Sequence, residues 1–362
     1  MKRILFPFIM LFMVGDIIIA QDKHPTLSKS EVEALTNALS MDSAFSTMVT
    51  SVGDPVKLYE NFKSDLRTDD SLWRYDQEHL SSLRDIGSTK RFELLPLIDW
   101  FTSNDSLIGE SGVSYLIRTD DATILFDVGL NLHDVDPSPL LRNMKRLGIR
   151  LEDIDAIVIS HPHGDHIGGE KWEGKGTLSL TSRQIDLGRK RVYTPIPMTY
   201  PGLKPVFSQQ PTRIAKGVAT IGVIACPLFF GSTVEQALAI TVEKRGIVVV
   251  SGCGHQTIEK LVRRTERLFD QPIYGLLGGF HLPLTEGRNI RPYLKYFYTG
   301  RLPWQPLTRA EVTNIADMLK LKGVQIIGIS GHDSCDSTIA IFRNAFGKSY
   351  TDIIVGKSVS LQ

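Results

Sequence analysis

Four side chains that can bind metal ions lie close together in SHPHGDHIGG, residues 160–169. The stretch contains His161, His163, Asp165 and His166. Burying such a cluster is costly unless a cation compensates it. Residues two apart can face one ion, so His161 and His163 suit a single site. Asp165 and His166 follow a glycine turn and can face a second ion nearby. Imidazoles with some carboxylate favour zinc, with manganese and iron as alternatives.

Three further histidines each follow an apolar run and a glycine turn. They are His255 after VVVSGCG, His281 after GLLGGF and His332 after IIGISG. Sites of α/β proteins usually lie where strands open into loops. We therefore predict that these segments converge on the first cluster. His255 and His332 are predicted ligands, whereas His281 is a ligand, a substrate contact or a structural residue.

The elements that must position these residues begin after residue 91, where short apolar runs alternate with helical patterns. This alternation predicts a layered α/β domain over residues 91–362. SYLIRTDDATILFDVG reads as two strands that end at Asp127. Asp127 is then a candidate to orient a ligand imidazole, with a simple turn aspartate as the alternative.

Residues 174–217 are rich in Pro, Thr and Arg, and their periodicity is weak. We expect irregular loops or an insertion near the site. Four residues of this segment could meet an anionic group or simply form a solvated charged loop: Arg183, Lys190, Arg191 and Tyr193.

The N-terminal part divides into two predicted segments. Residues 1–20 combine a basic start with an apolar stretch and Ala20, as in a cleaved secretory signal peptide, with an uncleaved anchor as the alternative. Residues 21–90 are polar and predict a helical extension. Its first helix is capped by Ser28 or Ser30, and a second helical pattern ends at Gly87.

The overall composition is that of an ordinary globular protein. The 362 residues are 42% hydrophobic and 22% charged, with a net charge of +1. A charge so near zero gives no reason to expect nucleic acid or an anionic membrane as a partner, and we expect a small-molecule substrate. The three cysteines do not form an even disulfide framework.

From about Leu97 onward, the sequence resembles the metallo-β-lactamase superfamily, whose hallmark is H-x-H-x-D-H after a strand. It looks closest to a branch of dihydropterin-forming ribofuranosyl-aminobenzene-phosphate synthase-like proteins. NMKRLGIRLEDIDAIVISHPHGDHIGG, EQALAITVEKRGIVVVSGCGH, LLGGFHL and GHDSCDS carry this closer likeness, together with ESGVSYLIRTDDATILFDVG.

The resemblance implies a four-layer αββα sandwich with a metal site along one edge. It implies one ion held by His161, His163 and His255. A second ion would be held by Asp165, His166 and His332.

The sequence departs from the superfamily pattern in two places. Many members place a bridging aspartate at a later strand end, where this chain has Phe280-His281. Cys253 could supply a thiolate instead, or be a small buried residue at a tight turn. The final motif reads His-Asp-Ser-Cys where the branch usually has His-Cys-Thr-Gly, which makes Asp333 a further candidate ligand.

We therefore expect an exported hydrolase that uses one or two divalent ions, best matched by zinc, to activate water on an ester, phosphoester or amide-type substrate. Asp165 would orient or deprotonate the water, and His281 is a candidate contact of the leaving group or oxyanion. The alternatives are a non-catalytic metal- or ligand-binding protein, a pterin-related synthase and a di-iron redox protein. Neither the substrate nor the oligomeric state follows from the sequence.

Overall fold

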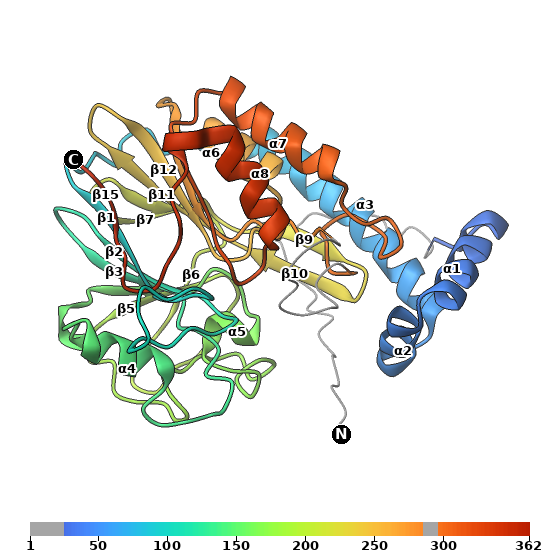
Figure 1. Ribbon diagram of the computed structural model, residues 1–362, viewed down its shortest axis with the longest axis horizontal. Coiled ribbons are helices and arrows are strands. Elements are labelled where there is room, and N and C mark those ends of the chain that lie inside the picture. Colours follow the sequence, from blue (N-terminus) through green and yellow to red (C-terminus); the bar gives the residue numbers. More distant parts are fainter. Residues whose placement is uncertain (1–24, 285–295) are drawn as a thin grey trace.

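The apolar runs of the C-terminal part form two large β-sheets packed face to face (Figure 1). The computed structural model describes residues 25–284 and 296–362. The predicted signal peptide, residues 1–20, lies outside the described residues. In the part that is described, no helix is both long and apolar enough to cross a membrane.

The first sheet has seven strands in the order β15-β1-β2-β3-β4-β5-β6. Their bounds are Phe92–Ile98 for β1, Ser114–Arg118 for β2, Thr123–Phe126 for β3, Ala156–Val158 for β4, Arg191–Thr194 for β5, Val206–Phe207 for β6 and Val359–Leu361 for β15. β3 to β6 run parallel. The histidine-rich stretch, residues 160–169, begins just beyond the carboxyl end of β4.

The second sheet has six strands in the order β14-β13-β12-β11-β8-β7. Their bounds are Thr212–Ala215 for β7, Val218–Thr220 for β8, Leu238–Val242 for β11, Gly246–Ser251 for β12, Ile273–Gly278 for β13 and Ile326–Ile329 for β14. β12, β13 and β14 are parallel, so their carboxyl ends meet at one edge. A separate ribbon pairs β9 (Ile224–Leu228) with β10 (Gly231–Glu235).

Three apolar clusters show that the sheets and helices form four layers. The core between the sheets includes Tyr115, Phe126, Ile240 and Val250. Helix α4 (Pro139–Arg146) covers the outer face of the first sheet. The outer face of the second sheet carries α6 (Ile258–Leu268), α7 (Arg309–Leu321) and α8 (Asp336–Phe346). The predicted αββα sandwich is thus confirmed, and Figure 1 shows α6 to α8 on the opposite side from α4.

The chain before β1 forms three helices, α1 (Lys29–Met41), α2 (Ser43–Val52) and α3 (Pro55–His79). Ser28 caps α1 in a capping box with Glu31, as one of the two predicted caps. The second predicted helix had the wrong bounds. It begins at Pro55, a favoured first helical residue, and ends at His79 well before Gly87.

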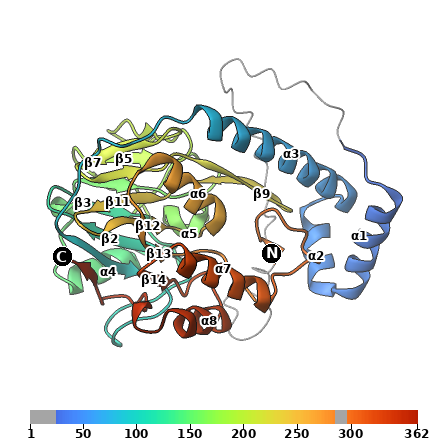
Figure 2. The ribbon, with the colours of Figure 1, turned by 90° about the horizontal axis from the view of Figure 1, so that it is seen from above.

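Aromatic packing and ion pairs hold this helical extension on the sandwich. Phe45 and Tyr59 of the extension pack in one buried cluster with Phe229, next to β9, and with Trp304. Figure 2 shows α3 running from beside the sheets out to α1 and α2.

The prediction of irregular structure over residues 174–217 was wrong in part. β5, β6 and β7 lie within this segment and extend both sheets. These strands are only two to four residues long, too short to give a recognisable alternation of apolar and polar residues.

Candidate metal centre

All six predicted ligands come from segments that follow strands, and they meet where the carboxyl ends of the two sheets adjoin. His161 and His163 follow β4, and Asp165 and His166 lie on the short helix α5 (Gly164–Ile167). His255 follows β12 and His332 follows β14. The first sheet therefore supplies four of these side chains and the second sheet two.

His161, His163 and His255 face one another. Their ring centroids lie 4.6 Å apart for His161 and His163, and 5.1 Å apart for both other pairs. His161 and His255 are buried, whereas His163 is partly exposed. This arrangement is the first ligand set that the superfamily resemblance implies.

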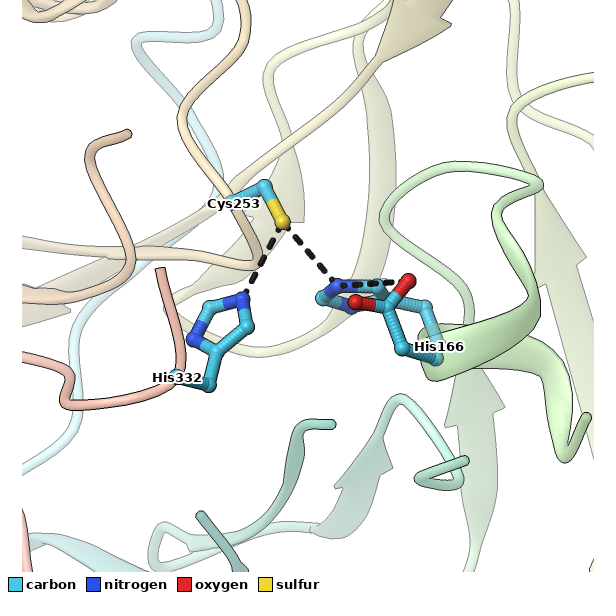
Figure 3. Close-up of side chains that lie close together, drawn as sticks. His166, Cys253 and His332 are labelled. Atoms are coloured by element: carbon cyan, nitrogen blue, oxygen red, sulfur yellow. Dashed lines mark hydrogen bonds and ion pairs between the residues drawn. The ribbon is translucent and has the colours of Figure 1, made fainter. Parts of the chain in front are cut away.

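Asp165, His166 and His332 form a second group around the sulfur of Cys253. The Cys253 Sγ atom lies 3.2 Å from His166 Nε2 and 3.1 Å from His332 Nε2 (Figure 3). An oxygen of Asp165 lies 3.8 Å from His166 Nε2, and the Asp165 side chain is 16% exposed. Asp165 and His163 are thus the residues of the cluster that solvent reaches.

Asp127, directly after β3, orients His166 by a direct hydrogen bond and His161 through Ser160. Its Oδ2 atom accepts a hydrogen bond from His166 Nδ1 at 2.7 Å and another from the Ser160 hydroxyl at 2.7 Å. Ser160 Oγ in turn lies 2.9 Å from His161 Nδ1. Because the serine proton goes to the carboxylate, His161 Nδ1 must be the donor, and its Nε2 keeps a lone pair.

A parallel arrangement of side chains orients His332. Ser330 Oγ donates to Asp99 Oδ2 at 2.6 Å and lies 2.6 Å from His332 Nδ1. Asp99 is also held by Tyr115 Oη at 2.8 Å, so it has a fixed position in the core. His332 Nε2 is thereby left as an acceptor that points toward Cys253 (Figure 3).

Glu235, the last residue of β10, fixes the turn that carries Cys253 and His255. Its Oε1 atom accepts the backbone N–H groups of Cys253 and Gly254, both at 3.0 Å, and its Oε2 atom accepts that of His255 at 2.7 Å. Burial raises the pKa of Glu235 to about 7, even though these hydrogen bonds favour the carboxylate. Three backbone bonds to one side chain define where the turn lies.

Two glycines allow the side chains of the centre to approach. A Cβ at Gly252 would lie 2.7 Å from Ser160 Cβ and 2.9 Å from Asp127 Oδ2. A Cβ at Gly279 would lie 2.7 Å from both Asp333 Oδ2 and His332 Cε1. All four distances are shorter than van der Waals contact, so the glycines of SGCGH and LGGFH make room for the site.

His281 and Asp333 lie beside both groups. The His281 ring lies 4.6 Å from that of His255, and its backbone N–H donates to Asp333 Oδ2 at 2.7 Å. His281 has a φ of 43°, a strained conformation for a histidine that is often found at functional sites. Both residues are buried, so they belong to the wall of the centre.

The protonation of the buried groups follows from their surroundings. Burial, followed by the neighbouring histidines, lowers the pKa values of His161 and His255 well below the usual range, so both are neutral. Burial also disfavours the charged form of His166, but Asp127 and Asp165 outweigh this and raise its pKa to about 9. Burial and the nearby carboxylates raise the pKa of the Cys253 thiol.

These residues fit a metal centre. Among the described residues, the buried atoms His161 Nε2 and His255 Nδ1 have no hydrogen-bond partner, a costly arrangement unless a cation accepts their lone pairs. Zinc bonds of about 2.3 Å to sulfur and about 2.0 Å to nitrogen place the ligands of one tetrahedral ion roughly 3.5 Å apart. The observed sulfur–nitrogen separations of 3.1 and 3.2 Å are close to this value.

The predicted anion contacts of residues 174–217 are not brought to the centre as a group. Tyr193 lies on β5 in the core between the sheets, so neither of the two alternatives, an anion contact or a solvated loop, describes it. The Arg183 guanidinium pairs with Asp136 Oδ2 at 2.7 Å, which makes it part of a surface ion pair.

Sequence reasoning missed Asp99, Ser160, Glu235 and Ser330. The serines did leave a signal, because VIS-H, VVS-GCGH and GIS-GH each place a serine at the strand end before a histidine. Asp99 and Glu235 are single acidic residues far along the chain from the histidines that they support, and nothing in their neighbourhood marks them.

Comparisons with known proteins agree with this fold and this centre. The model of the metallo-beta-lactamase superfamily matches residues 107–172, which include the H-x-H-x-D-H stretch. The chain is 27% identical over 260 residues to the 7,8-dihydropterin-6-methyl-4-(beta-D-ribofuranosyl)-aminobenzene-5'-phosphate synthase of Methanocaldococcus jannaschii, an overlap of 59% of this chain and 85% of that protein. A shorter match, 31% identical over 96 residues, covers 21% of this chain and 35% of the N-acyl homoserine lactonase AiiB of Agrobacterium fabrum.

Among solved structures, Tm1679, a metal-dependent hydrolase of the beta-lactamase superfamily, aligns with a TM-score of 0.51 and 19% identity, covering 75% of this chain and 99% of that one. The likeness to Tm1679 shows a shared fold. Residues 107–172 are similar to the metallo-beta-lactamase superfamily, and this match includes four of the six candidate ligands.

Proposed function

We propose that the chain is a metal-dependent hydrolase that holds one or two divalent ions, zinc being the best match to its ligands. His161, His163 and His255 would hold one ion, and Asp165, His166 and His332 the other. The observation that carries this proposal is the pair of buried, unpartnered nitrogens, His161 Nε2 and His255 Nδ1, on rings whose centroids lie 5.1 Å apart.

When bound, divalent ions of this kind lower the pKa of water and polarise a scissile carbonyl or phosphoryl group. The residues of the chain would then divide the remaining work. The Asp165 carboxyl group is partly exposed beside the histidines, so it can orient the attacking water and take its proton. Asp127 contacts His166 Nδ1 directly, and Asp127 and Asp99 reach His161 Nδ1 and His332 Nδ1 through a serine, so these carboxylates orient the imidazoles from the Nδ1 side. His281, in the wall of the centre, is the proposed contact for the leaving group or oxyanion.

We propose ester, phosphoester or amide-type small molecules as substrates, since the fold alone does not fix the reaction. The test is hydrolysis of a panel of chromogenic esters, phosphodiesters and lactones by the purified protein. Activity should disappear after chelation and return with zinc, manganese or iron. Asp165→Asn should lower kcat about 100-fold or more, the usual contribution of a general base.

The matched control is Asp105→Asn, which changes an exposed aspartate outside the centre. This variant should keep wild-type activity. Turnover that survives chelation, or an Asp165→Asn variant as active as wild type, would refute the proposed mechanism. A protein that binds metal but hydrolyses nothing in the panel would favour the non-catalytic binding protein.

A pterin-related synthase is the second candidate, favoured by the 27% identity to the M. jannaschii protein. It predicts that a dihydropterin with a leaving group on its 6-methyl carbon is joined to a ribofuranosyl-aminobenzene phosphate, with release of that leaving group. Mass spectrometry would detect the product. Hydrolysis of substrates in the panel, with no coupled product formed, would favour the hydrolase over the synthase.

We further propose that the protein is exported, on the basis of the signal-like sequence of residues 1–20. Expression of the full chain in its natural host, followed by fractionation and N-terminal sequencing, tests this. The proposal predicts a secreted or periplasmic protein that begins at Gln21. A cytoplasmic protein with an intact N-terminus would contradict it.

A further inference from the structure

Cys253 occupies the middle of the metal centre. Among the described residues, its sulfur belongs to three of the four groups of side chains whose ligand atoms lie within 4.8 Å of one another. One group joins it to His161 and His255, and another joins it to Asp165, His166 and His332. In the part of the chain that the structure describes, Cys253 therefore lies close to residues of both proposed ion positions.

The contacts of the sulfur are those of a ligand rather than of a packing residue. Cys253 is only 4% exposed, and two imidazole nitrogens lie 3.1 and 3.2 Å from its sulfur (Figure 3). These distances are those of hydrogen bonds to sulfur. A cation would replace the protons that the sulfur and the two imidazoles share.

The turn that carries Cys253 is built to hold the sulfur in place. Glu235 accepts the backbone N–H groups of Cys253 and its two successors. Gly254 has a φ of 75°, which other residues adopt only under strain. A tight turn alone would accept a small residue such as alanine, but it would not require a sulfur directed at two histidines.

We propose that Cys253 binds as a thiolate between the two ion positions, which it would share. The thiol proton is released to solvent when the metal–sulfur bond forms. Sulfur and imidazole ligands together select zinc, cobalt or iron over magnesium and calcium. This inference rests on the metal centre proposed above and adds a ligand to it.

Cobalt substitution tests the proposal, because a thiolate bound to Co²⁺ gives an intense charge-transfer absorption in the near ultraviolet. Wild-type protein loaded with cobalt should show this band. Cys253→Ser should lose the band, and its affinity for cobalt should fall by at least the tenfold to hundredfold typical of changes around a metal site. Cys226→Ser should keep both, because Cys226 is buried in β9 with its sulfur bonded to Ile224 O.

Cys253→Asp guards against simple unfolding, since a carboxylate can replace the thiolate as a ligand. This variant should retain the wild-type cobalt content without the band. Cobalt-loaded wild type that lacks the band, or Cys253→Ser that keeps it, overturns the thiolate. Wild type that binds no cobalt overturns the metal centre itself, so the two failures can be told apart.

Discussion

A serine between a carboxylate and a histidine occurs twice in this centre. Ser160 links Asp127 to His161, and Ser330 links Asp99 to His332. In each case the hydroxyl gives its proton to the carboxylate and accepts the one on Nδ1. The histidine is thereby locked in one tautomer before any ion binds, which lowers the cost of metal binding.

Ser330→Ala should therefore weaken metal binding without removing a ligand. The variant removes the Ser330 hydroxyl that lies 2.6 Å from His332 Nδ1, so the imidazole is held less firmly in its orientation. We expect a loss of about tenfold to hundredfold in affinity for one of the two ions, as for other residues that orient ligands. Competition with a chromogenic chelator measures this.

Ser138→Ala is the control, because Ser138 is a buried serine that caps α4 and bonds Leu180 O away from the centre. It should lower stability but leave the affinity for metal unchanged. Equal losses of affinity in both variants would mean that the Ser330 effect reflects general destabilisation.

At this scale the clustering of the candidate ligands was predictable from the sequence, but the residues that support them were not. His161, His163, Asp165 and His166 are adjacent in the chain, so their spacing alone indicated a shared function. Asp99 reaches His332 only because β1 and β14 bring distant segments together. A pairing that depends on the fold leaves no local pattern.

At the scale of elements, helix α3 is fixed to α6 by ion pairs that are unequally buried. Arg264 of α6 has a side chain only 1% exposed and pairs with Asp76 of α3, which is 25% exposed. Removing Asp76 leaves a charged guanidinium that water does not reach, whereas removing Arg264 leaves a carboxylate that water does reach.

Asp76→Ala should cost more stability than Arg264→Met. The first change leaves a buried guanidinium without its carboxylate, a loss of about 3–5 kcal/mol for a buried pair. The second leaves a carboxylate that water can reach, and the apolar methionine side chain fills the space of the buried arginine. Urea denaturation of the two variants measures the difference, and the reverse order would refute this account of the docking.

Stability in acid should depend on the contact between α1 and α3. Lys63 Nζ donates to Glu31 Oε1 at 2.8 Å, and this bond, with those from Ser28, lowers the pKa of Glu31 from 4.5 to about 2. Because the folded pKa is below the unfolded one, Glu31 contributes stability above pH 4.5 that is lost as the pH falls toward 2.

The difference in unfolding free energy between wild type and Glu31→Gln should accordingly shrink over this interval. Circular dichroism during denaturant titrations at several pH values follows it. A difference that stays constant with pH would show that the Glu31 carboxylate contributes nothing through its charge.

Elements were predictable where an amphipathic pattern follows a capping residue, such as α1 after Ser28. The short strands β5 to β7 and the bounds of α3 were not. A strand of two residues, such as β6, forms only through its pairing with a neighbouring strand, so it leaves no pattern in its own sequence. Helix α3 includes polar residues between its apolar ones, which hid its first turns from the apolar pattern.

At the scale of the whole molecule, the centre draws ligands from both sheets. His161 and His166 follow β4 of the first sheet, whereas His255 and His332 follow β12 and β14 of the second. A bound ion would therefore connect the two halves of the sandwich, and its binding free energy would add to the stability of the folded chain.

Removal of metal should lower the thermal and chemical stability of the protein. At a free zinc concentration of 100 times Kd, one site contributes about 2.7 kcal/mol. Denaturation of the protein with and without chelator measures this term. An unchanged midpoint would indicate that the centre does not bind zinc in the folded state.

The central claim, that this cluster is a metal centre, is tested most directly by elemental analysis of the purified protein from Gln21 onward, beside an Asp165→Ala/His166→Ala variant. The account predicts near two equivalents of zinc, manganese or iron, which fall to one or fewer in the variant. A single equivalent in the wild type would restrict the centre to one ion. Absence of metal under non-chelating conditions, or an unchanged content in the variant, would contradict the account.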